Sequence, residues 1–409
     1  MLSGYKILDL TLDLGSNGAK ILSDLGADVI KIESPSGSPE RALKPFYHDE
    51  PGEENSLVFW ANNTGKKGVT LDLDTEKGRE LFRALAKDAD AVMESFPDLG
   101  YMDSLGLGYE DLKKINPKIV YTQITPYGLN GPYVEQHWKY TDLTLWAMNG
   151  TMIESGYPDR PPVRISTHQV SIMTGQNAAL GTMTALFGVF AGGDGSKVEV
   201  SAFEAVQRLI FGQAPSWKFH QKLFHRSGPR NYRGPFLLRQ VWECKDGNVA
   251  VRLIPGKQAR TLKTLMDWII AEGEGEELRQ YNFENLELKP TDQPTVDKIE
   301  EIMGAFFLKR TKKELFTEAL KRRFDLVAVH DAADIVADDQ LEYRQFWSEI
   351  EHEDIGRTAK YPGTLFVSSE GRWAPTVRAP HLGEHNAQVY GALGIDAKEL
   401  DALKEGGVI

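Results

Sequence analysis

The stretch Pro161–Ala205 reads PPVRISTHQVSIMTGQNAALGTMTALFGVFAGGDGSKVEVSAFEA. Its middle, residues 176–191, is a charge-free run rich in Ala, Leu, Met, Gly and Phe, which predicts a helix buried on most of its faces. A membrane span needs about 20 apolar residues and this run has only about 16, so we expect a core helix. The GGDG segment at residues 192–195 ends the helix, and Lys197–Ser201 alternates polar and apolar residues as a strand does.

The segment before this helix, residues 164–171, is polar and holds one titratable side chain, His168. Backbone N–H groups point outward at a helix N-terminus and the helix dipole is positive there, so we expect any chemistry of this helix at that mouth. His168 and Ser171 are three residues apart, so on a helix they can meet as base and nucleophile. A structural histidine with satisfied hydrogen bonds is the simpler interpretation of His168, and we favour it.

The N-terminal half has the pattern of a parallel α/β protein. Tyr5–Leu10 and residues 29–33 are apolar strands, and residues 18–25 between them are helical. A strand, a helix and a strand within about 30 residues make a βαβ unit, which implies a parallel sheet with a right-handed crossover. Residues 75–87 form an amphipathic helix pattern with Thr75 placed as its N-cap.

We predict an α/β fold of two domains. The large one is a Rossmann-like parallel-sheet domain made of residues 1–219 and 333–409, and the small one is an α+β domain of residues 220–332. Within the small domain, Asp246-Gly247 between two apolar runs is a strong hairpin signal.

Composition narrows the possible partners. A net charge of −12 over 409 residues argues against nucleic acid or an anionic membrane surface as a partner. The single cysteine, Cys244, excludes an intrachain disulfide and fits a reducing compartment, and no signal peptide precedes the first strand, so we expect a cytoplasmic protein. His381 and His385 are four residues apart but lack a third ligand, so we predict no metal site.

Four segments carry a family resemblance. They are GDGSKVEVSAFEAV at residues 193–206, LGADVIKIE at 25–33, TPYGLNGPY at 125–133 and APHLGEHNAQVYGALG at 379–394. They resemble the class III CoA-transferases, the family of formyl-CoA transferase, carnitine CoA-transferase and α-methylacyl-CoA racemase. The resemblance runs from Ile7 to about Leu403, and it implies two chains threaded through each other as interlocked rings.

The resemblance also implies a specific chemistry. In the family, an aspartate at the mouth of the central helix attacks an acyl-CoA, forms a mixed anhydride, and then passes CoA to the acceptor acid through an enzyme thioester. A carboxylate serves because it is a nucleophile and, once acylated, a good leaving group. In this sequence the matching position falls on Val170 or Ser171, beside His168 and Gln169. Loss of such a nucleophile costs about 10⁴–10⁶ in rate.

Positions that grip CoA in the family are also altered. Ser34, Ser95 and Ser104 stand where the family commonly has an arginine, an asparagine and an arginine. Serine lacks the bidentate, always-charged guanidinium that binds phosphate, so we expect weak CoA binding. In the family an acidic residue beside a tyrosine lies near the active site, and Asp142 either matches it or caps a helix. The remaining candidate CoA contacts are Arg41, Phe96 and Lys139. Lys66 and Lys67 lie in residues 59–73, which we predict as a turn leading into a strand, and they are either phosphate contacts or solvated charges.

Three hypotheses follow. The first is a non-catalytic subunit of a heteromeric CoA-transferase, such as the benzylsuccinate CoA-transferase of anaerobic toluene degradation, whose donor is succinyl-CoA. A paralogous catalytic subunit would then supply the aspartate and bind CoA or acyl-CoA as substrate, with no covalently bound cofactor in either chain. The second is an active enzyme, homodimeric and using His168. The third is a binding or regulatory protein that keeps the fold.

Overall fold

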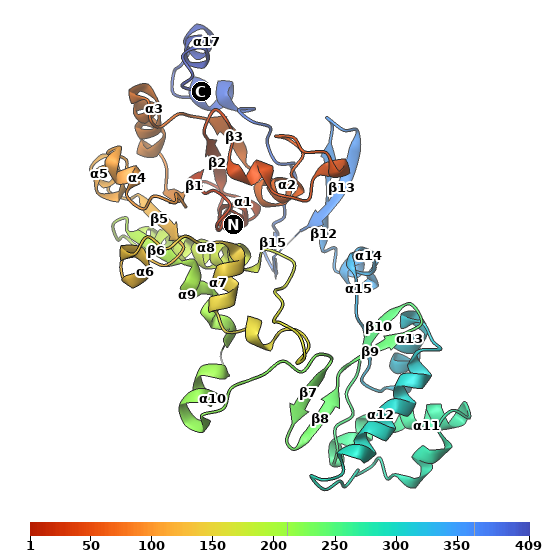
Figure 1. Cartoon of the computed structure of the whole chain (residues 1–409). Coiled ribbons are helices and arrows are strands. Elements are labelled where there is room, and N and C mark those ends of the chain that lie inside the picture. Colours follow the sequence, from red (N-terminus) through yellow and green to blue (C-terminus); the bar gives the residue numbers. More distant parts are fainter. Residues whose placement is uncertain (211, 364) are drawn as a thin grey trace. The chain divides into compact units, whose positions relative to one another are not determined.

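The computed structural model describes residues 1–210, 212–363 and 365–409 and divides the chain into two compact units (Figure 1). The large unit holds Met1–Met152, Arg164–Lys222 and Gln340–Ile409, and the small unit holds Ile153–Val163 and Leu223–Asp339. The small domain expected from the sequence, residues 220–332, begins close to Leu223 but ends before Asp339, and it leaves out residues 153–163.

A six-stranded sheet forms the centre of the large unit, and all its neighbouring strands are parallel. The order is β3-β2-β1-β4-β5-β6. Alternate residues of a strand face opposite sides of the sheet, so Ile7 of β1 enters one core and Leu8 enters the other. The predicted α/β class with a parallel sheet is confirmed. The strands are β1 (Lys6–Leu10), β2 (Asp28–Glu33), β3 (Lys67–Thr70), β4 (Ala91–Glu94), β5 (Val120–Thr125) and β6 (Lys197–Ser201).

Helices cover both faces of this sheet. One face packs against α3 (Glu76–Lys87), α4 (Tyr101–Ser104), α5 (Tyr109–Ile115), α16 (Asn386–Gly391) and α17 (Ala397–Glu405). The other packs against α1 (Asn17–Asp24), α7 (Asp142–Met148), α8 (Gln169–Phe190) and α9 (Ala202–Gln207). The large unit also contains α2 (Leu57–Asn63), α6 (Pro132–Glu135) and α10 (Gln213–His220), and α15 (Asp339–Tyr343) begins at its boundary.

Two local predictions had different outcomes. Thr75 is the N-cap of α3, and its side chain accepts a hydrogen bond from the Gly78 N–H at 3.0 Å, as predicted. The prediction of a turn from residue 59 was wrong for residues 59–63, which belong to α2. The Ser56 side chain accepts from the Phe59 N–H at 3.2 Å, and this cap starts a helix where the sequence shows only a short apolar run.

The central helix α8 begins at Gln169, seven residues before the predicted start at Gln176. A carboxylate from outside the segment caps it, because Asp142 Oδ1 accepts from the Val170 N–H at 3.2 Å. The expected burial on most faces is not reached within one chain: Leu180, Phe187 and Phe190 are 61%, 68% and 76% exposed. Among the helices that the structure describes, none combines the length and hydropathy needed to cross a membrane.

The small unit has its own core. Strand β9 (Val241–Cys244) pairs antiparallel with β10 (Gly247–Ala250) around the predicted Asp246-Gly247 turn, so the hairpin is confirmed. Strand β11 (Val327–Ala328) extends this sheet, and β7 (Arg230–Arg233) forms a second hairpin with β8 (Phe236–Arg239). The aromatic centre of the core consists of Trp242, Phe306 and Phe307. The helices are α11 (Lys263–Ala271), α12 (Gln293–Phe307), α13 (Lys312–Arg322) and α14 (Ala332–Val336).

The C-terminal segment returns to the large unit and covers the edge strand β3. The Tyr390 hydroxyl donates to the Thr70 carbonyl at 2.7 Å, and the Asn386 side chain bonds the Thr70 N–H and hydroxyl at 2.9 and 2.8 Å. These contacts satisfy polar groups that an edge strand otherwise exposes. Two antiparallel pairs precede this segment, β12 (Trp347–His352) with β13 (Arg357–Pro362) and β14 (Val367–Ser368) with β15 (Gly371–Arg372).

Helices α1 and α8 approach each other at two glycines. A Cβ on Gly175 would lie 1.9 Å from Asn17 Oδ1 and 2.7 Å from the Gly18 nitrogen, and a Cβ on Gly18 would lie 2.8 Å from the Gly175 carbonyl oxygen. No other residue type fits either position without moving one helix. This contact fixes the N-terminal half of α8 against the loop that follows β1.

We expect Gly175→Ala to lower the free energy of unfolding by about 1–3 kcal/mol, because the new methyl group overlaps Asn17 and the α1 backbone. Gly188→Ala is the matched control in the same helix, since a Cβ there meets no atom within 4 Å. Removing an interior helix glycine at an open position stabilises by about 0.5–1 kcal/mol. Urea unfolding of both variants measures the two effects, and equal changes of the same sign would contradict the close helix contact.

Candidate functional site

The carboxyl ends of the parallel strands form the edge where a ligand site is expected. Strand order reverses between β1 and β4, and open α/β sheets bind ligands in the crevice outside such a switch point. The loops after these two strands meet there, because the Leu12 N–H donates to the Ser95 hydroxyl oxygen at 2.8 Å. Three pockets of the large unit are lined by residues that follow these strand ends.

The first pocket, of about 390 Å³, surrounds Ser171 on the first turn of α8. The Ser171 hydroxyl donates to the Asp13 carbonyl at 2.6 Å and accepts from the Gly15 N–H at 3.0 Å. Both of its hydrogen-bonding roles therefore go to the backbone of the loop after β1. Val170, the alternative match for the nucleophile, is 1% exposed and has no polar side-chain atom.

His168 occupies the N-cap position of α8 and lines the same pocket. The Ser171 proton points to the Asp13 carbonyl and not to the imidazole, so this geometry lacks the base–nucleophile hydrogen bond of an activated serine. Gln169 turns back to the preceding segment, where its Nε2 donates to Thr167 Oγ1 at 2.6 Å. The predicted neighbours come together in space, but without a nucleophile–base pair.

Asp142 reaches the pocket from the start of α7. Its Oδ1 accepts from the Val170 N–H, and its Oδ2 lies 3.3 Å from Arg164 Nη1. An anion is favoured at this position because the first-turn N–H groups of α8 are unsatisfied and the helix dipole is positive there. Of the two roles considered for Asp142, these contacts support helix capping: Asp142 belongs to α7 and caps the start of α8.

Arg41 lies in a buried set of ion pairs and does not face a ligand. Its side chain is 3% exposed, its Nε and Nη2 bond the two Glu33 carboxylate oxygens at 2.7 and 2.8 Å, and its Nη1 bonds Glu54 at 2.7 Å. Burial alone would lower the pKa of Arg41, but the hydrogen bonds and charges of Glu33 and Glu54 outweigh it and leave that pKa raised. This bonding contradicts the predicted role of Arg41 in CoA binding.

Lys66 is buried too. Its ammonium lies 2.7 Å from Asp9 Oδ2 and donates to Asn63 Oδ1 at 2.9 Å, and its side chain has no exposed surface. Burial is the largest effect on the pKa of Lys66 and lowers it, although the Asp9 charge opposes the shift. The predicted phosphate contact through Lys66 is therefore wrong for this structure, since the ammonium is enclosed.

The other three candidates are placed differently. Lys67 is partly exposed and pairs with Asp28 at 2.7 Å, away from the three pockets. Phe96 packs edge-on against Tyr101 at 4.8 Å and lines a pocket of about 220 Å³. Lys139 is exposed and lines a pocket of about 790 Å³. Phe96 and Lys139 thus remain predictions of ligand contact that their positions allow.

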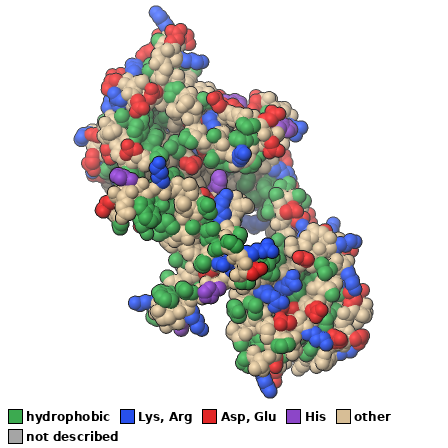
Figure 2. Space-filling view, viewed as in Figure 1, with side chains coloured by type: hydrophobic (Ala, Val, Ile, Leu, Met, Phe, Trp, Pro, Cys, Tyr) green, Lys and Arg blue, Asp and Glu red, His purple; other side chains and the backbone are tan. Residues whose placement is uncertain are grey.

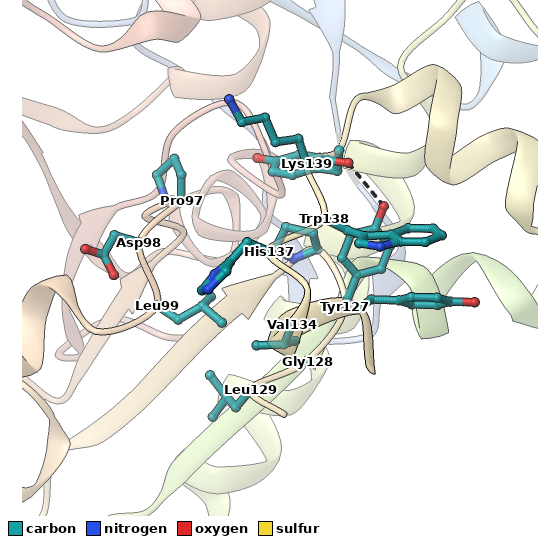
Figure 3. A pocket seen from close by; sticks show the side chains of 13 residues that line it. Pro97, Asp98, Leu99, Tyr127, Gly128, Leu129, Val134, His137, Trp138 and Lys139 are labelled. Atoms are coloured by element: carbon teal, nitrogen blue, oxygen red, sulfur yellow. Dashed lines mark hydrogen bonds between the residues drawn. The ribbon is translucent and has the colours of Figure 1, made fainter. Parts of the chain in front are cut away.

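Sequence reasoning missed two features of this edge. Burial raises the pKa of Glu94, at the end of β4, to about 7, and its carboxylate accepts from the Phe96 N–H at 2.8 Å. The pocket of about 790 Å³ is lined by Tyr127, Tyr133 and Trp138, and Figure 3 shows Tyr127 and Trp138. The aromatic spacing in residues 127–138 was visible in the sequence, but no periodic pattern indicated that the rings would gather.

The histidines considered for a metal are engaged elsewhere. His385 Nδ1 accepts from the Gly68 N–H at 3.1 Å, and His381 Nδ1 lies 3.1 Å from Glu54 Oε2. Within the described residues, no group of three or more His, Cys, Asp or Glu side chains is arranged to hold a metal ion. The His381 contact instead ties the C-terminal segment to the loop that Arg41 organises.

The parallel-sheet fold described above agrees with the family that comparison with known proteins identifies. The family model described as CoA-transferase family III matches residues 2–386. The chain belongs to CoA-transferase family III. It is 31% identical, over 100% of its length and 98% of the relative's, to the succinyl-CoA:(R)-benzylsuccinate CoA-transferase subunit BbsE of Thauera aromatica.

Two further matches extend over nearly the whole family III chain. The succinyl-CoA–L-malate CoA-transferase beta subunit of Chloroflexus aurantiacus is 26% identical over 100% of this chain and 98% of its own. The crystal structure of a CAIB/BAIF family protein from Brucella suis superposes with a TM-score of 0.82 at 28% identity, covering 96% of this chain and 99% of that one. The resemblance found in the sequence is confirmed at the level of family and fold.

We expect Arg41→Met to destabilise the chain by about 3–5 kcal/mol, because it leaves the buried Glu33 carboxylate without its partner. Lys67→Met is the matched control, since its ion pair with Asp28 is partly exposed and worth under about 1 kcal/mol. Urea unfolding of the two variants measures the difference. A loss at Arg41 no larger than at Lys67 would contradict a structural role for the buried ion pairs.

Proposed function

We propose that this chain is a non-catalytic subunit of a heteromeric family III CoA-transferase. A paralogous catalytic subunit would supply the aspartate and bind the acyl-CoA, and the complex would move CoA from succinyl-CoA to a carboxylic acid such as benzylsuccinate. The observation that carries the proposal is the first turn of α8. There the nucleophile position holds Ser171, whose hydroxyl is bonded on both sides to the backbone of residues 13–15.

The positions that would grip CoA support the same proposal. Ser34 Oγ donates to the Gly37 carbonyl at 3.0 Å, and Ser104 Oγ donates to the Tyr101 carbonyl at 2.7 Å. Ser95 Oγ accepts from the Leu12 N–H. Each hydroxyl serves the local backbone, so none supplies the charged fork that phosphate recognition uses. CoA binding is therefore assigned to the partner chain.

The proposed CoA donor, the proposed acceptor acid and the proposed partner subunit are taken from the names of relatives. One relative is a succinyl-CoA:(R)-benzylsuccinate CoA-transferase subunit and another is the beta subunit of a succinyl-CoA–L-malate CoA-transferase. Both names contain succinyl-CoA and both proteins are subunits, which favours a heteromer over a homodimer. A cytoplasmic location is proposed on the lone cysteine, Cys244, which suits a reducing compartment.

An uncovered face of α8 supports an assembly of interlocked chains. Leu180, Phe187 and Phe190 lie along it, and all three are more than half exposed. Soluble monomers rarely leave a contiguous apolar stripe of this kind in water. Two arrangements fit: a threaded heterodimer, or a homodimer of this chain docked against a homodimer of the catalytic subunit.

The first test concerns the purified chain alone. After incubation with succinyl-CoA, intact-mass spectrometry is expected to find no covalent acyl adduct, because no carboxylate occupies the nucleophile position. The catalytic paralogue treated in the same way is the positive control and is expected to form the adduct. Turnover or an adduct on the pure family III chain would refute the proposal.

A second test separates the two catalytic hypotheses. In the reconstituted complex, His168→Ala is expected to change the steady-state rate by less than about tenfold, a barrier change of about 1.4 kcal/mol. If His168 were a catalytic base in this chain, its removal would cost about 10²–10⁴ in rate. Gln169→Ala, at the next position of the same helix turn, is the matched control for the loss of a polar side chain beside the Ser171 pocket.

A further inference from the structure

We infer that a separate pocket, in the small unit, binds a small aliphatic amino acid, with the ligand's ammonium group on acidic side chains of α12 and its carboxylate on Arg239. The pocket has a volume of about 390 Å³, within the range of small-molecule sites. Its lining comes from β7, β8, β9 and α12 and the residue that ends α12, so it lies wholly within residues 223–339. It shares no residue with the three pockets of the large unit described above, and the inference does not rest on the proposed function.

One side of α12 forms the largest part of this lining. The lining residues of α12 recur every three or four positions, which places them on one side of the helix, while the opposite side enters the core of the small unit. The stripe begins with acidic residues and ends with small or apolar ones: Asp297, Glu300, Glu301, Gly304, Ala305 and Leu308. Figure 2 shows basic and acidic side chains intermixed on the side of the small unit that carries α12. The pocket is therefore polar at one end and apolar at the other.

A buried carboxylate in this stripe lacks a hydrogen-bond donor on one of its oxygens. Glu300 is 2% exposed, and its Oε1 accepts from the Arg239 N–H at 2.7 Å. Its Oε2 accepts no hydrogen bond from the described residues and lies 3.0 Å from Arg230 Nη1. That Nη1 is shared, because it also donates to Asp297 Oδ1 at 3.3 Å. A buried carboxylate oxygen without a donor is costly in free energy, and an ammonium group brings three N–H donors.

Two further carboxylates add to the acidic end. Glu301 lines the pocket from α12 and Glu243 lines it from β9, and both residues are exposed. Of the four carboxylates in the lining, only those of Asp297 and Glu300 form ion pairs among the described residues, both with Arg230. Four carboxylates against two guanidinium groups leave an excess of negative charge, which favours a cationic group on the ligand.

The second guanidinium, that of Arg239, has donors left for a carboxylate. Its Nε donates to the Val241 carbonyl at 3.1 Å, and its guanidinium carbon lies 5.0 Å from the centre of the Trp242 ring. Within the described part of the chain, Nη1 and Nη2 of Arg239 make no hydrogen bond or ion pair. Two adjacent guanidinium N–H groups bind a carboxylate in a bidentate geometry.

These groups together select the class of ligand. Phosphate would meet the excess of carboxylates, and a bare divalent cation would leave the Arg239 donors unused. An amino acid carries the ammonium and the carboxylate that the two sets of side chains need. The apolar end of the stripe, Ala305 and Leu308, suits an aliphatic side chain on that amino acid.

The test is calorimetric titration of the purified full chain with L-leucine and with two analogues that keep its side chain. Isocaproate lacks the amino group and isopentylamine lacks the carboxylate. L-leucine is expected to bind at least about tenfold more tightly than either analogue, because each analogue loses the charge-assisted hydrogen bonds at one end. Isopentylamine binding as tightly as L-leucine would overturn the inference, since the site would then take any cation. No saturable binding of L-leucine at millimolar concentrations would overturn it as well.

Two variants assign the two ends of the ligand. Arg239→Met is expected to weaken L-leucine binding by about tenfold and to leave isopentylamine binding unchanged, because that analogue has no carboxylate. Glu301→Gln is expected to weaken L-leucine and isopentylamine and to spare isocaproate. Arg279→Met and Glu284→Gln are the matched controls, since both residues are exposed in the same unit and lie outside the pocket lining. L-leucine binding that survives both pocket variants, or that falls equally in the controls, would contradict the assignment.

Discussion

The close contact of α1 and α8 at Gly18 and Gly175 is the constraint on which the candidate site depends. With no side chain at either position, the two helices approach until backbone atoms meet, and the first turn of α8 comes to the loop after β1. Ser171 then bonds that loop from the helix side, and Asn17 Nδ2 donates to the Ile172 carbonyl at 3.2 Å from the other. The packing therefore holds the Ser171 hydroxyl against the loop after β1, with backbone groups as both its acceptor and its donor.

A second constraint lies beneath the crevice, where the side chains of Arg41 and Lys66 are enclosed. Arg41 joins Glu33, Glu54 and the Pro380 carbonyl, so one guanidinium connects β2, the following loop and the C-terminal segment. Lys66 and Asp9 make a similar pair under β1. Buried ion pairs contribute little net stability compared with apolar packing, but losing one partner is costly, so they specify a single arrangement of these loops. The crevice floor is rigid as a result, and poor in free positive charge.

Much of the fold follows from local patterns, whereas the site depends on long-range contacts. The Thr75 cap and the Asp246-Gly247 turn were predictable because their partners lie within four residues. The true start of α8 was not, because its cap is Asp142, 28 residues earlier in the chain. Arg41 and Lys66 were candidate CoA contacts for the same reason. Their partners Glu33 and Asp9 look like ordinary strand residues, and only the packed sheet encloses them.

The family comparison identifies CoA transfer as the chemistry of this family. The side chains in the crevice can be compared with those that this chemistry needs. A transferase site of this kind needs a carboxylate at the α8 mouth and cations for the CoA phosphates. Here the first turn of α8 carries a bonded hydroxyl and Lys66 is paired in the core, while Tyr127, Tyr133 and Trp138 line a pocket at the ends of β4 and β5. Apolar rings exposed in such a crevice persist at low free-energy cost only if a ligand or another chain buries them.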